Sequence, residues 1–244
     1  MQNKEVTHKQ IITSLLVGDG YMNYSEEHGH YRIGTTSSNK YYEDYHNWKH
    51  SLMVNIFGDK VRKCLTKNDI LISYYSNKKD ITPYYKFLYR NNNGKNERVC
   101  SKFLQRLNHP MCLAIWFMDD GSCCGNKSYN SKGEKYFTSY SFYLATNQFN
   151  YSDHELMVKW FKQEFDIDCK IYKQIYSNPN HCGYGRIEYR LRFNASNSKK
   201  IWQLINPYVI QFDSMKYKFR FAYLRDNLNI KRIPIDFELS DYIK

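Results

Sequence analysis

The chain of 244 residues is long enough to bury a sizeable core, to which 24 Tyr and 14 Phe contribute large side chains. Its formal net charge of +12 favours a polyanionic partner, most often nucleic acid, although a merely basic soluble protein stays open on charge alone. The composition excludes a membrane span, because no apolar run is long enough, and the N-terminal residues do not form a signal peptide.

The first half of the chain is predicted to open with an apolar helix. Thr7 and Gln10 form a capping box that starts this helix, and Gly18-Asp19-Gly20 ends it. The patterning that follows predicts the order strand, strand, helix, strand, strand, helix. The expected ranges are Tyr21–Asn23, Tyr31–Thr35, Tyr41–Phe57, Ile70–Tyr75, Tyr84–Tyr89 and Arg98–Leu107, with a basic loop, Ser76–Thr82, before the fourth strand.

The second half repeats this order of elements without repeating the residues. Pro110 is well placed to start a helix, and Ser152 with Glu155 forms a capping box for a later one. The expected elements are the helix Met111–Met118, a long polar loop Cys123–Lys135, the strand Phe137–Ala145, a helix to Phe165, the strands Lys170–Tyr176 and Arg186–Phe193, and the helix Lys199–Ile205. We therefore predict an α+β protein, a pseudo-twofold tandem repeat of αββαββα units with subdomains at residues 1–108 and 109–244.

The strand Arg186–Phe193 alternates strictly between apolar and charged residues. Its apolar residues are expected to enter a core, and the other face carries three guanidinium groups and Glu188. A cationic sheet face suits contacts with phosphates and base edges in a DNA groove; a solvated face with scattered ion pairs is the alternative. The residues predicted to contact DNA are Arg32, Lys78, Lys79, Lys86, Lys127, Lys132, Lys170, Lys173, Arg186, Arg190 and Arg192.

Two Asp-Gly pairs, at Asp19 and Asp120, lie 101 positions apart, each directly after an apolar helix. Asp-Gly is a favoured turn dipeptide, so a single pair would indicate only a turn. A carboxylate is unfavourable at the negative C-terminal end of a helix, and a shared divalent cation would offset this cost. Ligation by carboxylates, carbonyl groups and water suits Mg²⁺.

Around these pairs the chain resembles a known family. The segments SLLVGDG (Ser14–Gly20) and LAIWFMDDG (Leu113–Gly121) are similar to the two motifs of LAGLIDADG homing endonucleases, and WFMDDG is the more specific. With Pro-Tyr and Met-Lys-Tyr-Lys-Phe in Ile205–Phe219, the chain resembles a single-chain, two-motif member encoded in a mitochondrial intron. The resemblance covers roughly residues 8 to 220.

The resemblance implies that the two motif helices pack side by side at the interface between the two halves of the chain. It also implies two saddle-shaped antiparallel sheets that contact the major grooves of double-stranded DNA. It implies that Asp19 and Asp120, with the carbonyl groups of Gly18 and Asp119, hold Mg²⁺, for which Mn²⁺ is a substitute. The expected product is a double-strand break with short 3′ overhangs at a long asymmetric intron-insertion site. The expected enzyme is a monomer from an organelle, namely a mitochondrion or, alternatively, a chloroplast, in agreement with the AT-rich coding bias of the composition.

Three motif positions depart from the family pattern. Ser14 and Val17 stand where small or acidic residues are usual, and Asp119 replaces a small residue near the helix crossing. We therefore expect a looser or wetter helix contact there. Asp120 is preferred over Asp119 as the acid, because it precedes the glycine and matches Asp19 in register.

Family members often place one basic residue from each half near the scissile phosphates. Lys218 matches this pattern in the second half, and Lys95 and Arg98 both fit in the first. A solvated surface charge is the alternative for each of the three.

Metal ligation by the Cys and His residues is not expected. The seven cysteines have no Cys-x-x-Cys spacing, which favours free thiols in a reducing compartment. His46 and His50 are four apart on a predicted helix, but the further ligands that zinc needs are not evident. His28 and His30 are expected on a hairpin tip near the DNA backbone.

Three classes of function are compatible with these features. A DNA endonuclease is favoured, because both acids are present. The alternative is a binding protein on the same scaffold, either an RNA maturase that helps its own intron to splice or a DNA binder that does not cleave. A basic structural protein of an organelle ribosome would not need two aspartates at equivalent repeat positions.

Overall fold

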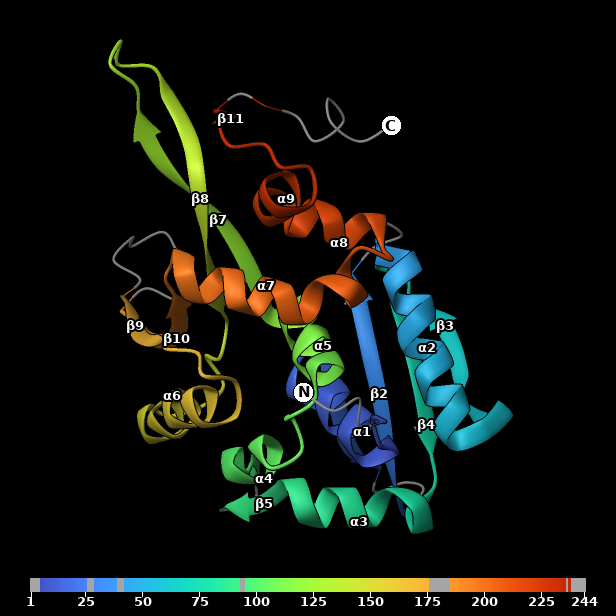
Figure 1. Ribbon diagram of the computed structural model, residues 1–244. Helices are drawn as coiled ribbons and strands as arrows, with labels where there is room; N and C mark the ends of the chain where they lie inside the picture. Colours follow the sequence, from blue (N-terminus) through green and yellow to red (C-terminus); the bar gives the residue numbers. More distant parts are fainter. Residues whose placement is uncertain are drawn as a thin grey trace. The chain divides into compact units, whose positions relative to one another are not determined.

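The computed structural model describes residues 5–25, 29–38, 42–92, 95–175, 185–235 and 237. It shows an α+β protein whose strands pair antiparallel (Figure 1). The internal contacts divide the chain into two compact units: residues 1–119 with Tyr208–Met215 form unit 1, and Asp120–Pro207 with residues 216–244 form unit 2. No helix in the described part of the chain is long and apolar enough to cross a membrane.

Unit 1 is built around a four-stranded sheet with the order β1-β2-β4-β3. A separate hairpin, β5-β6, and the second motif helix, α5, follow it in the chain. The elements are α1 (His8–Val17), β1 (Gly20–Ser25), β2 (His30–Ser38), α2 (Glu43–Phe57), a 3₁₀ turn (Gly58–Lys60), β3 (Arg62–Leu65), β4 (Ile70–Ser76), α3 (Lys78–Leu88), β5 (Tyr89–Asn92), β6 (Lys95–Arg98), α4 (Cys100–Leu104) and α5 (Pro110–Asp120).

Unit 2 contains a five-stranded sheet in which β8 pairs with β7 along one edge and with β10 and β11 along the other. Strand β9 completes the sheet beside β10. The elements are β7 (Gly121–Tyr129), β8 (Lys135–Leu144), α6 (Tyr151–Phe165), β9 (Lys170–Ile175), β10 (Ile187–Phe193), α7 (Ala195–Val209) up to Pro207, α8 (Asp213–Lys218) from Lys216 on, α9 (Arg220–Ala222), a π-helix (Tyr223–Asn227) and β11 (Ile233–Pro234).

The two units repeat one topology. The order β7-β8-β10-β9 in unit 2 corresponds to β1-β2-β4-β3 in unit 1, and a 15-residue helix, α6 or α2, separates the two strand pairs. A motif helix precedes each sheet, and a further helix, α3 or α7, follows it. The predicted tandem repeat of αββαββα units is therefore confirmed.

The motif helices form because they are capped and apolar. Thr7 accepts a hydrogen bond from the backbone of Gln10, whose side chain bonds back to Thr7, as the predicted capping box requires. α5 is buried on every side from Met111 to Met118, which is typical of a helix in the centre of a core.

The prediction of a capping box from Ser152 and Glu155 is wrong. Asn150 caps α6, since its side chain accepts the Asp153 N–H at 2.9 Å and Asp153 bonds back to the Asn150 N–H at 3.3 Å. A capping box does start α6, but the helix begins two residues earlier than Ser152 and Glu155 predicted.

Three predicted segments differ from the structure. Tyr84–Tyr89 lies mostly in helix α3, and the expected basic loop Ser76–Thr82 contains the start of that helix, where Asn77 accepts the Asp80 N–H. The expected loop Cys123–Lys135 contains most of β7. Aromatic residues favoured a strand in the first case, whereas polar residues on a solvent-facing strand concealed β7 and the fully exposed β3.

The alternation in β10 holds for only half of the strand. Leu191 and Phe193 are buried as predicted, but Ile187 is 48% exposed and Glu188 only 4% exposed. β8 pairs with β10 only over the last three residues of that strand, so the sheet narrows to two strands at Ile187. The core therefore does not extend to Ile187.

Candidate active site

The first candidate acid lies on a turn whose backbone is held from several sides. α1 ends at Val17, and β1 begins at Gly20, so Asp19 lies between the two elements. Thr36 donates its hydroxyl to the Asp19 carbonyl oxygen at 3.1 Å. Arg98 donates to the carbonyl oxygens of Val17, at 3.1 Å, and Gly20, at 3.0 Å. Asp19 itself is exposed, so a fixed backbone presents an accessible acid.

Both glycines that flank Asp19 are required by close packing. A Cβ atom on Gly18 would lie 2.5 Å from both Cβ and Oδ2 of Asp119, and one on Gly20 would overlap the Leu15 carbonyl group. The contacts that exclude a Cβ at these positions are ones that real Cβ atoms do not make, so only glycine fits without rearrangement.

Asp119 forms a buried ion pair with Lys49 of α2. Its Oδ1 atom accepts hydrogen bonds from Lys49 Nζ at 3.0 Å and from the Tyr45 hydroxyl at 2.9 Å, and its Oδ2 atom accepts the Asp19 N–H at 3.1 Å. The side chains of Lys49 and Asp119 are both 0% exposed. Lys49 also donates to the Thr36 carbonyl oxygen at 3.0 Å. Both carboxylate oxygens of Asp119 therefore accept hydrogen bonds from residues of unit 1.

These contacts overturn the expectation of a loose or wet contact between the motif helices. Ser14 is buried and forms a side-chain hydrogen bond with the Cys112 thiol of α5, and Val17 is 1% exposed. Asp119 fills the space that Gly18 leaves open. The larger residue of one motif is matched by the smaller residue of the other, so the contact is closed and dry.

The second candidate acid, Asp120, ends α5 and begins unit 2. Its carbonyl oxygen accepts the Ala145 N–H at 3.0 Å, which fixes its backbone to the end of β8. The residue is half-buried.

The three candidate basic residues have different environments. Arg98 binds two backbone carbonyl groups of the Asp19 turn, as described above. Lys218 is the last residue of α8 in unit 2. Lys95 begins β6, and its side chain lies outside the described residues.

The histidines of α2 connect the helix to the sheet. His46 Nδ1 lies 3.1 Å from Ser37 Oγ, and Nε2 lies 2.9 Å from Ser73 Oγ. Burial, with the nearby charges of Lys49 and Lys63 and the His50 ring, lowers the pKa of His46 to about 3, so the ring is neutral. Within the described residues no three His, Cys, Asp or Glu form a metal-binding cluster. His28 and the His30 side chain lie outside the described residues.

The predicted DNA contacts of unit 1 are divided between the sheet and α3. Arg32 of β2 donates to Ser76 Oγ at 3.3 Å and covers the Tyr74 ring at 4.8 Å. The register places Arg62 of β3 opposite Tyr74, and the three residues line one hollow. Lys78, Lys79 and Lys86 lie instead on α3, where all three are exposed. Sequence reasoning missed Arg62 because it missed β3.

In unit 2, Lys170 and Arg192 are register partners on neighbouring strands and line a hollow. Lys173 lies on the opposite face of β9, because side chains alternate along a strand. Arg186 and Arg190 both pair with the buried Glu188 carboxylate, so ion pairs of the kind named as the alternative are present around β10. Two further predicted residues are exposed: Lys127 on β7 and Lys132 in the turn that follows it.

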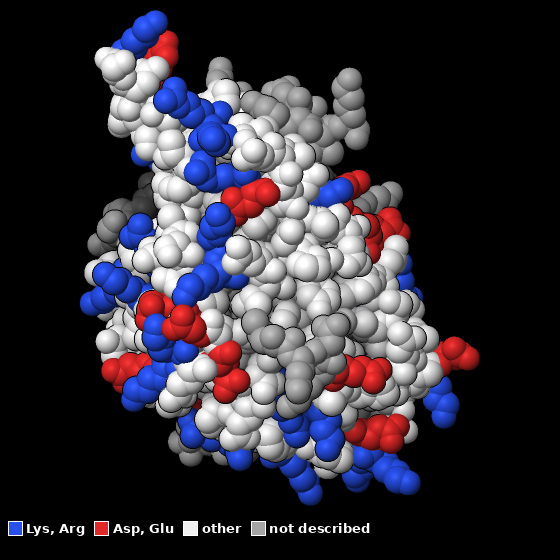
Figure 2. All heavy atoms as spheres, viewed as in Figure 1, with Lys and Arg blue, Asp and Glu red and all other residues white. Residues whose placement is uncertain are grey.

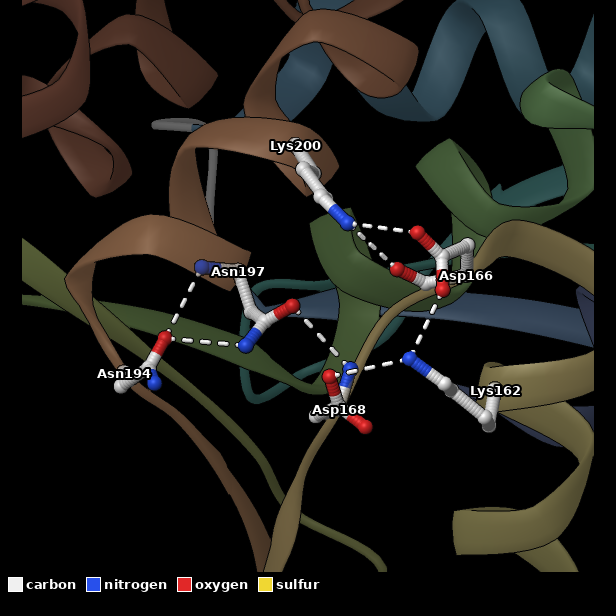
Figure 3. A network of polar contacts seen from close by, with 6 residues as sticks. All are labelled: Lys162, Asp166, Asp168, Asn194, Asn197 and Lys200. Atoms are coloured by element: carbon white, nitrogen blue, oxygen red, sulfur yellow. Dashed lines mark hydrogen bonds and ion pairs between the residues drawn. The ribbon is translucent and has the colours of Figure 1, made fainter.

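Ion pairs link α6 and α7 to the segment between α6 and β9 (Figure 3). The Asp166 carboxylate forms ion pairs with Lys162 at 2.7 Å and with Lys200 at 2.9 Å. Hydrogen bonds from these two lysines lower the pKa of Asp166 to about 2. Asn197 accepts the Asp168 N–H at 3.0 Å. The pairs are exposed, so they order the segment that precedes Lys170 more than they stabilise the fold.

A second cationic hollow adjoins the first. Both hollows are lined by Ala195, and the second is also lined by Lys199, Arg225 and Lys231. None of these three cations forms an ion pair with a described acidic residue. Figure 2 shows Lys and Arg gathered in a column over this side of unit 2. The three residues had no signal in the sequence, because they come from α7, the π-helix and the segment before β11.

Comparison with known proteins assigns the family. Residues 9–201 match the model of the LAGLIDADG DNA endonuclease family, so the chain belongs to that family. It is a site-specific DNA endonuclease, a hydrolase of phosphodiester bonds. Nucleases of this family depend on divalent metal ions.

Solved structures share the fold. The homing endonuclease I-WcaI bound to its DNA recognition sequence superposes with a TM-score of 0.56, at 21% identity over 89% of this chain and 88% of that one. The meganuclease I-AabMI bound to uncleaved DNA gives a TM-score of 0.56 at 12% identity over 91% of both chains. I-SmaMI bound to cleaved DNA gives 0.53 at 12% identity, over 94% of this chain and 93% of that one.

Proposed function

We propose that this endonuclease hydrolyses both strands of a DNA duplex in the presence of Mg²⁺, with Asp19 and Asp120 as the metal-binding acids. One observation carries the assignment. The carboxylate of Asp119 is enclosed by Lys49 and Tyr45 and by the backbone N–H of Asp19. Its position and burial leave Asp120 as the acid of the second motif.

The donor groups fit Mg²⁺. Asp19 is an exposed carboxylate, and the carbonyl groups of Gly18 and Asp119 precede the two acids in the chain. Mg²⁺ usually takes one or two protein carboxylates and completes its octahedron with water and phosphate oxygens, so a three-residue cluster is not needed. Mn²⁺ has similar ligand preferences and should substitute.

A metal ion held by Asp19 and Asp120 would supply activation of the attacking water and stabilisation of the leaving oxygen. The chain's own residues orient it: Asp19 and Asp120 supply negative charge, and Thr36 and Arg98 hold the turn around Asp19. Lys218, and Lys95 in the first half, are proposed to stabilise charge on the phosphate, whereas the contacts of Arg98 favour a role in holding the turn.

The substrate is proposed to be a long duplex contacted by both sheets. Unit 1 offers Arg32 and Arg62, and unit 2 offers Lys170 and Arg192. Because the two sheets carry different side chains, the site should be asymmetric. The similar structures of I-WcaI and I-AabMI are complexes with DNA, which supports this choice of substrate.

The sequence supports a proposal for the biological setting. One chain carries both motifs, so we propose a monomer. The motif resemblance and the AT-rich coding bias support an intron-encoded enzyme of a mitochondrion or chloroplast, with an intron-insertion site as target and short 3′ overhangs as product. Its own intron RNA is proposed only as a further partner.

A library of long random duplexes tests this function. Purified protein with Mg²⁺ should select and cut one class of sequence, and an equal amount of Asp19→Asn protein should bind the same class without cutting it. Lys159→Ala, an exposed change on α6, serves as the matched control. Binding of folded intron RNA with no cut duplex in any library pool would support the maturase alternative instead.

A further inference from the structure

The Lys49–Asp119 ion pair is not repeated in the second half of the chain. α2 and α6 have the same length, and their seventh residues are Lys49 and Met157. The residue before the motif acid is Asp119 in one repeat and Gly18 in the other. By contrast, the fourth residue is a buried histidine in both helices. The shared topology is therefore built without this ion pair in one of the two units.

The two carboxylate oxygens of Asp119 have different partners. Oδ1 accepts from Lys49 and Tyr45, and Oδ2 accepts the N–H of Asp19. A buried carboxylate without a cation would be strongly destabilising, and Lys49 offsets part of that penalty. A charged acceptor also binds a backbone N–H about twice as strongly as a neutral one. The pair therefore maintains a strong acceptor next to Asp19.

We propose that Asp119 is a positioning residue, which orients the Asp19 carboxylate by holding the Asp19 N–H, and that Lys49 is its ionic partner in the core. Thr36 holds the carbonyl group of Asp19, so both backbone polar groups of the acid are fixed. This inference rests on the proposed role of Asp19 in metal binding. A misplaced Asp19 should bind the metal less well without changing the surfaces that contact DNA.

The double variant Lys49→Met/Asp119→Leu tests the proposal. It removes both charges, so no uncompensated ion remains in the core, but it leaves the Asp19 N–H without its acceptor. The unfolding temperature should stay within a few degrees of wild type, and DNA affinity without divalent cations should be unchanged. The Mg²⁺ concentration for half-maximal single-turnover cleavage should rise about tenfold, with a cleavage rate lower by about tenfold or more. A wild-type rate and Mg²⁺ midpoint would overturn the proposal.

Asp119→Asn provides a second measurement, which decides the matter if the double variant does not fold. An asparagine has one acceptor oxygen, which cannot serve Lys49 and the Asp19 N–H together, so the Mg²⁺ midpoint should again rise. Thr146→Val is the matched control, because it removes the 2.8 Å contact of the buried His154 in unit 2. Thr146→Val should lower the unfolding temperature and leave the Mg²⁺ midpoint unchanged. If its Mg²⁺ midpoint rose as much as that of Asp119→Asn, general destabilisation would account for both effects and the proposal would be overturned.

Asp19→Asn, measured in parallel, separates the role of Asp19 in cleavage from the positioning role of Asp119. If Asp19→Asn cleaves normally, the proposed function fails. If Asp19→Asn is inactive while the double variant cleaves as wild type does, only the positioning role fails.

Discussion

Gly18 and Asp119 are complementary residues on the two motif helices. The two residues are far apart in the sequence but adjacent in the fold. A Cβ atom on Gly18 would lie 2.5 Å from Asp119. The missing side chain in one motif therefore makes room for the carboxylate in the other. Such matched pairs are sensitive to small increases in volume, because buried neighbours can yield only a few tenths of an ångström.

Gly18→Ala should therefore lower both stability and cleavage. The added methyl group would displace Asp119 from the Asp19 N–H and strain the helix contact, at a cost of about 1–3 kcal/mol in the free energy of unfolding. Urea unfolding and single-turnover cleavage would measure the two effects. Ser152→Ala, an exposed change on α6, is the control. Wild-type values for Gly18→Ala would show that the contact can open without consequence.

His46 should make the protein sensitive to acid. Its folded pKa of about 3 lies below the ordinary value of 6.5, so the unfolded chain takes up a proton first as the pH falls. Stability should therefore be complete above pH 6.5 and decline between pH 6.5 and about 3, with a loss of about 2 kcal/mol by pH 5.

His46→Gln should flatten this decline, because glutamine can still bond Ser37 or Ser73 but does not titrate in this range. Chemical unfolding at pH 7, 6 and 5 would show the difference. If the free energy of unfolding fell equally with pH in wild type and variant, the acid sensitivity would come from another residue.

At the scale of elements, the sequence predicted those whose side chains repeat a clear pattern. α1, α5 and β8 were expected because capping residues, proline or apolar alternation mark them. β3 was missed, because all four of its residues are exposed and no apolar face marks it. The predicted order of the elements still matched, because two errors compensated: β3 was missed, and the strand expected at Tyr84–Tyr89 lies mostly in helix α3.

The active-site prediction was limited by distance along the chain. Both Asp-Gly pairs could be identified from the motifs, but the ion partner of Asp119 is 70 positions away on a helix without a recognisable signature. Likewise, Arg98 is 81 positions from the Val17 carbonyl group that it binds. Contacts of this kind follow from tertiary packing, which a single sequence does not reveal.

The three cations that line the second hollow of unit 2 should contribute to DNA affinity through counterion release. Replacing Lys199, Arg225 and Lys231 by alanine removes three positive charges that have no acidic partner among the described residues. The slope of log affinity against log salt should become shallower by up to about 2.7, since each neutralised phosphate contributes roughly 0.9.

A titration of duplex binding between low and moderate salt measures this slope. Replacement of Lys162, which is already paired with Asp166 and Asp168, provides a matched control that should change it little. An unchanged slope in the triple variant would show that these three cations do not contact DNA phosphates.

At the scale of the whole molecule, the tandem repeat puts two similar but unequal units into one chain. Each unit has its own sheet and its own set of cations, and the motif helices share the closed contact at Gly18 and Asp119. One chain therefore carries all the proposed acids. Sedimentation of the complex with a defined duplex should show one protein chain per duplex; two chains per duplex would contradict the proposed monomer.

The central claim, that Asp19 and Asp120 act together as metal-binding acids, is tested most directly by double-strand cleavage with Asp120→Asn protein. On the selected duplex with Mg²⁺, this variant should bind with an affinity within about threefold of wild type and release no double-strand product, because the change removes a charged ligand and keeps the side-chain shape. Full cleavage by Asp120→Asn would contradict the account.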